Sequence, residues 1–558
     1  MYSDIRRQLQ EIIDQAVQTT CPEAGRPSII IDTPADKQHG EFSCNIALQL
    51  SRALKKSPMA IAGQLMPAIS DILRQHPLKD HIANIEVKAP GFVNFFLSRA
   101  GFYSFLSDVF IQKADYGKSA YGQGKKFCLE FVSANPTGPL TVAHGRQAAV
   151  GDTLVNILKT VGFDAKKEYY VNDEGNQINI LGRSIGARAR QLLGQDVPFP
   201  EDGYQGDYIR AMAQEFMDQN GIKTLADLER QSEGALRQFG VAYLMDVIKK
   251  DLVDFDVHFD IWSYQSKIAD YKAIESVLAD LKGKGFIYEQ EGAWWFKSTL
   301  WGDDKDRVVR KSNGDYTYLT PDIVYHKNKF DRGFGRIVNI LGPDHHGYVP
   351  RIKAAAGALG KSPDDLDVII VQLATIFRDG KEVSMSTRRG EFISLREVME
   401  EVGKDAARFF FLMRQASSHL EFDLELAKRQ SAENPVYYIQ YAHARTHSII
   451  RKARAESGIE PKTSGIGRLD KPEEIDLMRN IGFYPEVLIA CAKTLEPFAL
   501  LCYLQELAGG LHKFYNFHRV LDEADKDLSA ERLALIEAVR IVLNNSLNLL
   551  GVCAPEKM

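Results

Sequence analysis

The spacing of apolar residues along the chain separates an α/β part from a helical part. Residues 125–132 are an apolar run with little polar alternation, which is typical of a strand buried on both faces. Apolar residues then recur at helical spacing from Ala148 to Val161, and Gly162 ends this predicted helix. A second strand is predicted at 165–173. This strand–helix–strand order predicts a βαβ unit and therefore a parallel sheet.

Later segments extend this sheet domain. Short apolar runs at 336–341 and 367–374 predict two further strands. The stretch from about 185 to 300 is mixed and rich in helical spacing, so we expect it to be an insertion. We assign residues 120–415 to the sheet domain.

The first part of the chain has its own helices and strands. Ser57–Pro58 has the cap-and-proline order of a helix start, and 85–98 predicts two strands separated at Pro90–Gly91. A linker rich in Gly and Lys follows at about 114–126, so we assign residues 1–115 to a separate α/β domain. Its first helix carries an apolar stripe at Ile5, Leu9, Ile12, Ile13 and Val17.

After about residue 394 the pattern turns helical. Ser394 and Glu397 have the spacing of a capping box, and Asn434–Pro435 predicts the start of another helix. Long apolar stripes follow with few strand signals. We therefore assign residues 430–558 to an all-α helical bundle.

Composition sets limits on these assignments. The chain has 558 residues, 45% hydrophobic and 26% charged, and a net charge of −5, as expected for a globular protein of roughly three or four domains. An acidic total does not exclude a nucleic-acid binder, because a basic groove can lie on an acidic protein. Six cysteines show no C-x-x-C pair, no membrane-length apolar run is present and the N-terminus is no signal peptide. We expect buried free thiols and a cytoplasmic protein.

The loop "FVSANPTGPLTVAHGRQAAVGD", residues 131–152, joins the first predicted strand of the sheet to its helix. Ligands of open parallel sheets bind at the carboxyl ends of strands, and a helix N-terminus attracts anions. His144 there can donate to a phosphate, and Gly145 lets the backbone come close. The loop is neither a dinucleotide fingerprint nor a Walker loop. A nucleotide site and a capped helix with a satisfied His explain these residues equally well.

The chain as a whole resembles arginyl-tRNA synthetases. "SANPTGPLTVAHGR" is similar to the HIGH region of class I aminoacyl-tRNA synthetases, and further strings resemble the arginyl family in its order. They are "YYVNDEGNQI", "YQGDYIRAMA", "YTYLTPDIVYHKNKF", "LGPDHHGYVPR", "MSTRRGEF", "NPVYYIQYAHAR" and "APEKM". The resemblance implies a class I Rossmann-like parallel-sheet catalytic domain between an N-terminal α/β domain and a C-terminal all-α bundle.

The resemblance implies activation of L-arginine by ATP to arginyl-adenylate, and transfer to the 3′ terminal adenosine of tRNA(Arg). It implies Mg²⁺ bound with ATP, no zinc, no metal-ligating residues, no membrane and a monomer. His144 and Thr141 match catalytic positions of the HIGH motif. The matching ATP-binding positions are Ala134, Asn135, Pro136, Thr137, Gly138, Pro139, Leu140, Val142, Ala143, Gly145, Met385 and Ser386.

Arginine recognition requires carboxylates, because a guanidinium pairs with a carboxylate through two parallel hydrogen bonds. Glu130 and Asp322 match the guanidinium pocket of the family, although alone they could be a solvent-facing strand residue and a helix N-cap. Tyr318 would flank the side chain, Asn135 would hold the amino-acid end, and Asp344 matches a further arginine-binding position.

Two signatures depart from the family pattern. Thr141 stands where the first His of HIGH is usual, and Ala143 replaces the Gly, but a Thr hydroxyl can still donate to a phosphate. The second signature, usually K-M-S-K, is "SMSTR", with Ser384 and Thr387 in the lysine places. Gly138 stands where some members carry a compensating lysine. Our hypothesis is that Arg388 or Arg389 supplies the missing charge, because a guanidinium binds phosphate oxygens well. The D-G pair at 379–380 predicts a hairpin turn before this loop.

The resemblance also implies tRNA-contacting positions. In the bundle these are Tyr441, Arg445, Tyr515 and Met558, and in the N-terminal domain Phe92 and Asn94. Tyr441 and Tyr515 could equally be core residues at helical spacing. Basic residues at Arg52, Lys55 and Lys56 could follow phosphates but are more typical of a solvated face.

His345–His346 beside Asp344 could be metal ligands, but we interpret them as a wall of the ATP pocket, and we assign no ligand role to Tyr169 and Tyr170. Two other functions remain open: a catalytically weakened tRNA-binding paralogue, and a small-molecule adenylate-forming ligase on the same sheet. The retained pocket residues argue against the first, and the tRNA-reading tail argues against the second.

Overall fold

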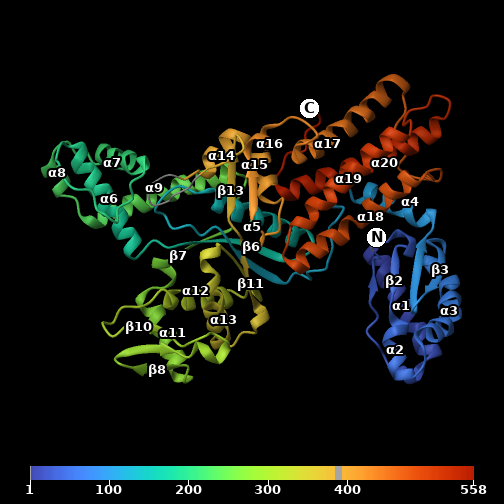
Figure 1. The fold of residues 1–558 in the computed structure, drawn as a ribbon, viewed down its shortest axis with the longest axis horizontal. Coiled ribbons are helices and arrows are strands. Elements are labelled where there is room, and N and C mark those ends of the chain that lie inside the picture. The colour runs from blue at the N-terminus through green and yellow to red at the C-terminus, as the bar shows by residue number, and fades with distance from the viewer. Residues whose placement is uncertain (1, 35, 384–391) are drawn as a thin grey trace.

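The computed structural model describes residues 2–34, 36–383 and 392–558. Figure 1 shows an N-terminal domain, a central sheet domain with two lobes, and a helical bundle. The N-terminal domain packs helices on one antiparallel sheet with strand order β1-β2-β4-β3. Its elements are α1 (Tyr2–Thr20), β1 (Ile31–Asp32), β2 (Phe42–Cys44), α2 (Ile46–Leu54), α3 (Pro58–Gln75), β3 (Ile82–Lys88), β4 (Phe92–Leu97) and α4 (Arg99–Gln112).

Local sequence signals of this domain are confirmed. The Ser57 hydroxyl accepts a hydrogen bond from the Ala60 amide at 3.3 Å and starts α3. Strands β3 and β4 pair antiparallel on either side of Pro90–Gly91. The apolar stripe of α1 is buried, with Leu9 and Ile13 fully inaccessible to solvent.

The central domain is built on a five-stranded, wholly parallel sheet with the order β12-β11-β5-β6-β7. The chain leaves β5 for β6 on one side and returns to β11 on the other side. The strand order therefore reverses beside β5, and ligands bind at such a reversal, at the carboxyl ends of the strands. The strands are β5 (Lys126–Glu130), β6 (Asp164–Val171), β7 (Ile261–Tyr264), β11 (Arg336–Leu341) and β12 (Leu366–Ile370), and α5 (Val142–Thr160) joins β5 to β6.

The stretch expected to be one insertion, 185–300, contains a strand of the main sheet. Strand β7 lies within it and pairs parallel with β6, so the stretch forms two separate excursions (Figure 1). The pattern missed β7 because it has only four residues between helices. The first lobe holds α6 (Asn176–Leu192), α7 (Asp207–Gln219), α8 (Leu225–Glu229) and α9 (Glu233–Asp254). The second holds α10 (Gln265–Ile268), α11 (Tyr271–Gly283), β8 (Ile287–Gln290), β9 (Ala293–Phe296), β10 (Arg307–Arg310) and α12 (Leu319–Asp331), and α13 (Val349–Ala358) links β11 to β12.

A small sheet with the order β14-β13-β15 follows the main one. The predicted D-G turn is confirmed, because β13 (Ala374–Arg378) and β14 (Lys381–Glu382) pair antiparallel around Asp379 and Gly380, both at positive φ. Strand β15 (Leu420–Asp423) pairs with β13 inside the region expected to be helical. Around it lie α14 (Leu395–Val402), which starts at the predicted capping box, α15 (Lys404–Phe411) and α16 (Leu424–Lys428).

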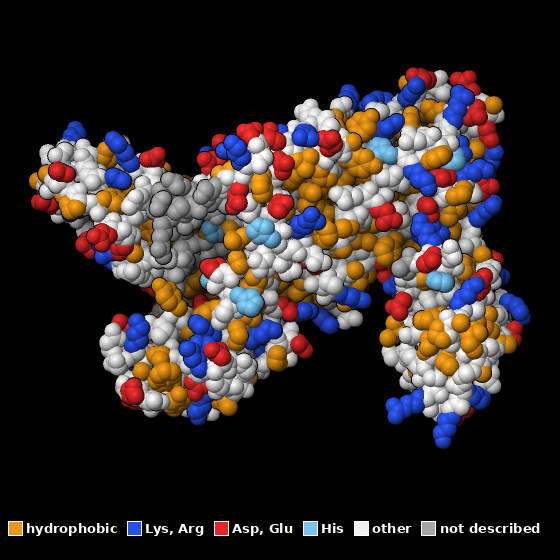
Figure 2. Space-filling model, in the orientation of Figure 1, with side chains coloured by type: hydrophobic (Ala, Val, Ile, Leu, Met, Phe, Trp, Pro, Cys, Tyr) orange, Lys and Arg blue, Asp and Glu red, His pale blue; other side chains and the backbone are white. Residues whose placement is uncertain are grey.

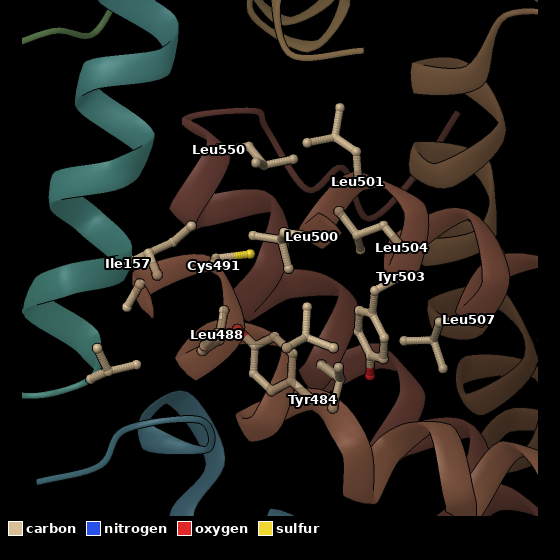
Figure 3. Packing of buried hydrophobic residues seen from close by; sticks show 14 of the residues in the cluster. Ile157, Tyr484, Leu488, Cys491, Leu500, Leu501, Tyr503, Leu504, Leu507 and Leu550 are labelled. Carbon is tan, nitrogen blue, oxygen red and sulfur yellow. The ribbon is translucent and has the colours of Figure 1, made fainter. Parts of the chain in front are cut away.

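The C-terminal bundle shares its core with the sheet domain. Figure 3 shows Ile157 of α5 pointing toward Leu488 and Cys491 of the bundle. Helix α20 is long and apolar enough to cross a membrane, but 72% of its most apolar window is buried in the protein. The bundle consists of α17 (Pro435–Lys452), α18 (Pro472–Thr494), α19 (Phe498–Phe517) and α20 (Lys526–Leu550).

Buried charges lock the bundle to the sheet domain. The Asp152 carboxylate of α5 pairs with Arg408 and Lys167. Arg408 also donates to the carbonyl of Leu550 at 2.7 Å and to that of Phe255 at 2.9 Å. These charges are paired and hydrogen-bonded, which is the condition for burying them. All six cysteines are free thiols, but only four are buried as expected, since Cys502 and Cys553 are exposed.

Candidate active site

A cavity of about 590 Å³ opens where the strand order reverses, at the carboxyl ends of β5 and β11. Glu130 is the last residue of β5 and Leu341 the last residue of β11, and Gly342 comes directly after Leu341. The start of α5 supplies His144 and Gln147 to the same wall. Sheet topology therefore brings the predicted loop and the predicted carboxylates to one place.

The chain bends sharply as it leaves β5. Val132 and Ser133 have φ values of 67° and 40°, which a β-branched residue such as Val132 rarely adopts. The Ser133 hydroxyl fixes the bend, because it donates to Glu130 Oε1 at 3.1 Å and accepts from the Tyr170 amide at 3.1 Å. This bend positions the carboxylate of Glu130 at the cavity wall.

Glu130 is 7% exposed, so it is not a solvent-facing strand residue. Its second carboxylate oxygen, Oε2, accepts a hydrogen bond from the fully buried ammonium of Lys329. Lys329 also donates to Asn339 Oδ1 at 3.1 Å. Glu130 therefore reaches the pocket with one oxygen already paired to a cation.

Asp322 lies in the first turn of α12, but Tyr318 is the N-cap residue, so the N-cap interpretation of Asp322 is wrong. The hydroxyl of Tyr348 donates to Asp322 Oδ2. Burial raises the pKa of the Asp322 carboxyl to about 7. The hydrogen bond from Tyr348 opposes this shift, the negative charge of Glu130 adds to it, and Lys329 opposes it.

His144 is the third residue of α5, and the backbone N–H of Thr141 donates to its Nδ1 at 3.1 Å. The proton of a neutral His144 therefore sits on Nε2, which can donate to a ligand. Burial lowers the pKa of His144 to about 4, against an opposing effect of Asp344. The hydroxyl of Thr141 lies 3.1 Å from the same Nδ1, so Thr141 orients His144.

The other predicted loop residues divide between cavity and core. Ala134, Asn135, Tyr318 and Asp344 line the cavity with His144. Asn135 donates to Gln177 at 2.7 Å, and Tyr318 is 68% exposed. In contrast, Leu140 and Val142 are buried in the core.

Gly145, the residue after His144, has a packing role that the sequence did not indicate. A Cβ atom on Gly145 would lie 2.7 Å from the Leu395 side chain and 3.0 Å from Phe411. The glycine is therefore required for close packing of α5 against α14 and α15. In the same loop, the Thr137 carbonyl accepts a hydrogen bond from Tyr208 of α7 at 2.7 Å. This bond connects the segment 136–139 to the first lobe.

Several residues in and behind the pocket were missed in the sequence. His326, which lines the cavity, and Lys329, which lies behind it, follow Asp322 at i+4 and i+7, the spacing of one helix face, and this was the available signal. Tyr170, to which no ligand role was assigned, lines the cavity, and Tyr348 does so as well. Tyr169 is a core residue, as expected, and its hydroxyl donates to the Ala134 carbonyl at 2.9 Å.

His345 lines the cavity and lies 3.4 Å from an Asp344 oxygen. Among the residues that the structure describes, no group of three or more His, Cys, Asp or Glu side chains is placed to hold a metal ion. The predicted residues Met385, Ser386, Arg388 and Arg389 lie outside the described residues.

Three of the four residues predicted to contact tRNA in the bundle, Tyr441, Arg445 and Tyr515, form one cluster. The Arg445 guanidinium lies 4.0 Å from the centre of the Tyr515 ring and 5.9 Å from that of Tyr441. Tyr441 and Tyr515 are 40% and 37% exposed, so they are not core residues. Met558 is exposed as well.

The N-terminal candidates differ from one another. Phe92 is 37% exposed, but Asn94 is 1% exposed and accepts a hydrogen bond from Ser43 at 2.7 Å. The side chain of Asn94 therefore joins β2 to β4, and its predicted contact with tRNA stays a prediction. Figure 2 shows basic side chains at the free end of this domain near α2, where Arg52, Lys55 and Lys56 are exposed.

Comparisons with known proteins cover all three parts of the chain. Residues 105–429 match the family model of the class I tRNA synthetase (R) catalytic domain. Residues 7–97 match the arginyl-tRNA synthetase N-terminal domain, and 439–558 match the DALR anticodon-binding domain.

Whole proteins give the same assignment. The chain is 46% identical over 558 residues to an arginine–tRNA ligase of Anoxybacillus flavithermus, covering 99% of each chain. It is 45% identical over 534 residues to that of Citrifermentans bemidjiense, covering 95% of each. The structure of Thermus thermophilus arginyl-tRNA synthetase has the same fold, with a TM-score of 0.74 at 21% identity and coverage of 99% and 100%. The chain belongs to the arginyl-tRNA synthetase family.

Proposed function

We propose that this chain activates L-arginine with ATP and transfers the arginyl group to the 3′ terminal adenosine of tRNA(Arg). One observation carries this proposal. Two carboxylates, Glu130 and Asp322, line the same cavity as His144 at the N-terminus of α5. The cavity therefore combines a site for a guanidinium with a site for phosphates.

In this proposal the guanidinium of arginine pairs with Asp322 and with the remaining acceptor of Glu130. Tyr318 flanks the side chain at the mouth of the cavity, and Asn135 holds the amino-acid end. Asp344, which lines the same cavity, contributes further to arginine binding. A substrate without a guanidinium would leave buried carboxylates unpaired, which disfavours it strongly.

ATP binds along residues 134–145 with its phosphates at the start of α5. The arginine carboxylate attacks the α-phosphorus, the bond to the pyrophosphate oxygen breaks, and arginyl-adenylate forms. His144 Nε2 and the amides of the helix start stabilise the charge on the phosphate oxygens. The adenosine hydroxyl of tRNA then attacks the arginyl carbonyl carbon, and AMP leaves.

Mg²⁺ enters this scheme bound to ATP. Phosphate oxygens are hard ligands of the kind that Mg²⁺ prefers. From the sequence we further propose that Arg388 or Arg389 stabilises the leaving pyrophosphate. Unchanged activation in both Arg388→Ala and Arg389→Ala would contradict this role.

We propose that the three segments, 1–115, 120–415 and 430–558, bind the outer corner, the acceptor end and the anticodon region of tRNA respectively. The exposed cluster of Tyr441, Arg445 and Tyr515 supports the last assignment, because splayed bases stack on aromatic rings and guanidinium planes. We also propose a cytoplasmic, monomeric enzyme.

Arginine-dependent ATP–pyrophosphate exchange, with and without tRNA(Arg), tests the function. We expect exchange with arginine that is lost in Asp322→Asn, and no exchange with lysine or citrulline. Absent exchange in both conditions, with tRNA binding intact, would instead support the tRNA-binding paralogue. Exchange with another amino acid but no charged tRNA would support a small-molecule adenylate-forming ligase.

A further inference from the structure

A continuous series of hydrogen bonds connects the carboxylate of Glu130 to the backbone carbonyl of Asp322. Lys329 Nζ donates to Glu130 and, at 3.1 Å, to Asn339 Oδ1. The Asn339 amide donates to His326 Nε2 at 2.8 Å, and His326 Nδ1 donates to the Asp322 carbonyl at 2.8 Å. These hydrogen bonds thus connect the end of β5 through β11 to the first turn of α12.

Lys329 is the unusual member of this series of hydrogen bonds, because its ammonium lies behind a pocket that must receive a cation. Its side chain is fully buried, and Nζ also lies 4.1 Å from the centre of the Tyr325 ring. A lysine is buried in this way only when its charge is paired. Glu130 is its ion-pair partner, so one of the two pocket carboxylates is already compensated.

The other charged groups near the pocket are balanced by partners of opposite charge. They therefore do not alter the net charge set by Glu130, Asp322 and Lys329. Glu168 lies behind Tyr325 and is paired with Arg332 through two hydrogen bonds of 2.8 Å. The Cys128 thiol faces Lys329, and burial keeps its pKa well above the usual value, so it is neutral. On the Asp322 side, the phenols of Tyr170, Tyr325 and Tyr348 are neutral because burial raises their pKa values. Arg351, 5.5 Å from the centre of the Tyr348 ring, and Asp344 also line the cavity, and their opposite charges offset each other.

We propose that Lys329 is a positioning residue that sets the charge of the arginine pocket to match one guanidinium. When Asp322 is ionised, the two carboxylates of the pocket and the ammonium behind them leave a single negative charge in excess. Lys329 pairs with Glu130 Oε2, so Oε1, which also accepts from Ser133, is the Glu130 oxygen left for a guanidinium, while Asp322 presents the main acceptor. This inference rests on the proposed function, because it assigns the pocket to arginine.

Removal of the ammonium should affect arginine binding in a particular way. Without Lys329, two carboxylates would share one buried site, and such a pair retains a proton to higher pH. That proton would have to leave before arginine binds with full affinity. We therefore expect Lys329→Met to raise the KM for arginine about tenfold or more near neutral pH and to shift the midpoint of its pH dependence upward by about one pH unit.

A charge-matching test separates this role from a structural one. Glu130→Gln leaves one carboxylate and one ammonium, so it should raise the KM for arginine more than Lys329→Met does. The double variant Glu130→Gln, Lys329→Met again carries one negative charge. We expect its KM for arginine to be lower than that of Glu130→Gln alone, whereas a structural role predicts that the two losses add.

The experiment is ATP–pyrophosphate exchange in the presence of tRNA(Arg), with the KM for arginine and for ATP measured across pH. Lys329→Gln accompanies Lys329→Met, because Gln keeps a hydrogen-bonding side chain without the charge and disturbs folding less. Lys327→Met is the matched control, since Lys327 is on the same helix in a surface ion pair with Asp331. The KM for ATP should stay within about twofold in all variants.

The proposal would be overturned if the midpoint of the pH dependence of the arginine KM were unchanged in both Lys329 variants. It would also be overturned if the double variant had an arginine KM no lower than that of Glu130→Gln. Failure of the proposed function would look different, because the unmodified protein itself would show no arginine-dependent exchange.

Discussion

The hydroxyl of Tyr348 donates a hydrogen bond to the carboxylate of Asp322, joining the turn after β11 to the first turn of α12. This bond stabilises the ionised form of a carboxyl whose pKa is raised to about 7 by burial. The cavity therefore contains a carboxyl group that titrates close to neutral pH.

The first prediction concerns the pH dependence of arginine binding. Asp322 attracts a guanidinium only when ionised, so the KM for arginine should rise as the pH falls below about 7. In Tyr348→Phe the ionised form loses its hydrogen bond, and the midpoint should move to higher pH. The measurement is the KM for arginine in exchange assays between about pH 6 and about pH 9. A KM for arginine that is flat across this range would contradict the role of Asp322, and the KM for ATP is the internal control.

Much of this arrangement follows from the sequence. Apolar spacing alone indicated β5, α5 and β6, and parallel topology then placed the loop at 131–152 at the carboxyl edge of the sheet. The capping box of α14 and the D-G turn were also correct, because both are local signals within a few residues. The family resemblance added Glu130 and Asp322. No local pattern shows that these two residues, far apart in the sequence, line the same cavity.

The errors have physical causes as well. Strands β7 and β15 have four residues each, and their strand structure depends on pairing with β6 and β13 respectively. A lysine on a helix is normally solvated, and Lys329 is buried only through Glu130, which lies 199 residues earlier in the chain. Burial of Asn94 likewise depends on the neighbouring strand β2, whose Ser43 contacts it.

The second prediction concerns His144, whose pKa is lowered to about 4 by burial, so that it is neutral at physiological pH. His144→Ala removes a donor at the helix start and should lower kcat for activation about 10²-fold to 10³-fold, with little change in the KM for arginine. His144→Gln should recover part of this loss. The exposed His258 provides the control variant His258→Ala. A large rise in the arginine KM with unchanged kcat would place His144 in substrate binding instead.

The third prediction concerns the cluster of Arg445, Tyr441 and Tyr515 on the bundle. Tyr515→Ala should weaken tRNA(Arg) binding by about 1–3 kcal/mol, because a stacking surface is lost. Arg445→Ala should also reduce the salt dependence of binding. Filter binding at two or more salt concentrations measures both effects. Phe517→Ala is the matched control, because Phe517 is exposed on the same helix but two residues apart and so on another face. Equal losses in Phe517→Ala and Tyr515→Ala would argue against a specific cluster.

The last prediction concerns the buried ion pair of Asp152 and Arg408. Arg408→Met would leave Asp152 with Lys167 alone and free the carbonyls of Leu550 and Phe255, so the free energy of unfolding should fall by about 3–5 kcal/mol. The double variant Asp152→Asn, Arg408→Met should lose less than the sum of the single variants, because the second change removes a charge that the first has left partly unpaired. Thermal unfolding followed by circular dichroism measures these shifts, with the exposed Arg7→Ala as the control.

The same ion pair should also couple the unfolding of the two domains. Since Arg408 bridges α5, α15 and the end of α20, the sheet domain and the bundle should unfold in one transition in the unmodified protein and in two transitions in Arg408→Met. Additive losses with a single transition in every variant would show that the pair does not couple the two domains.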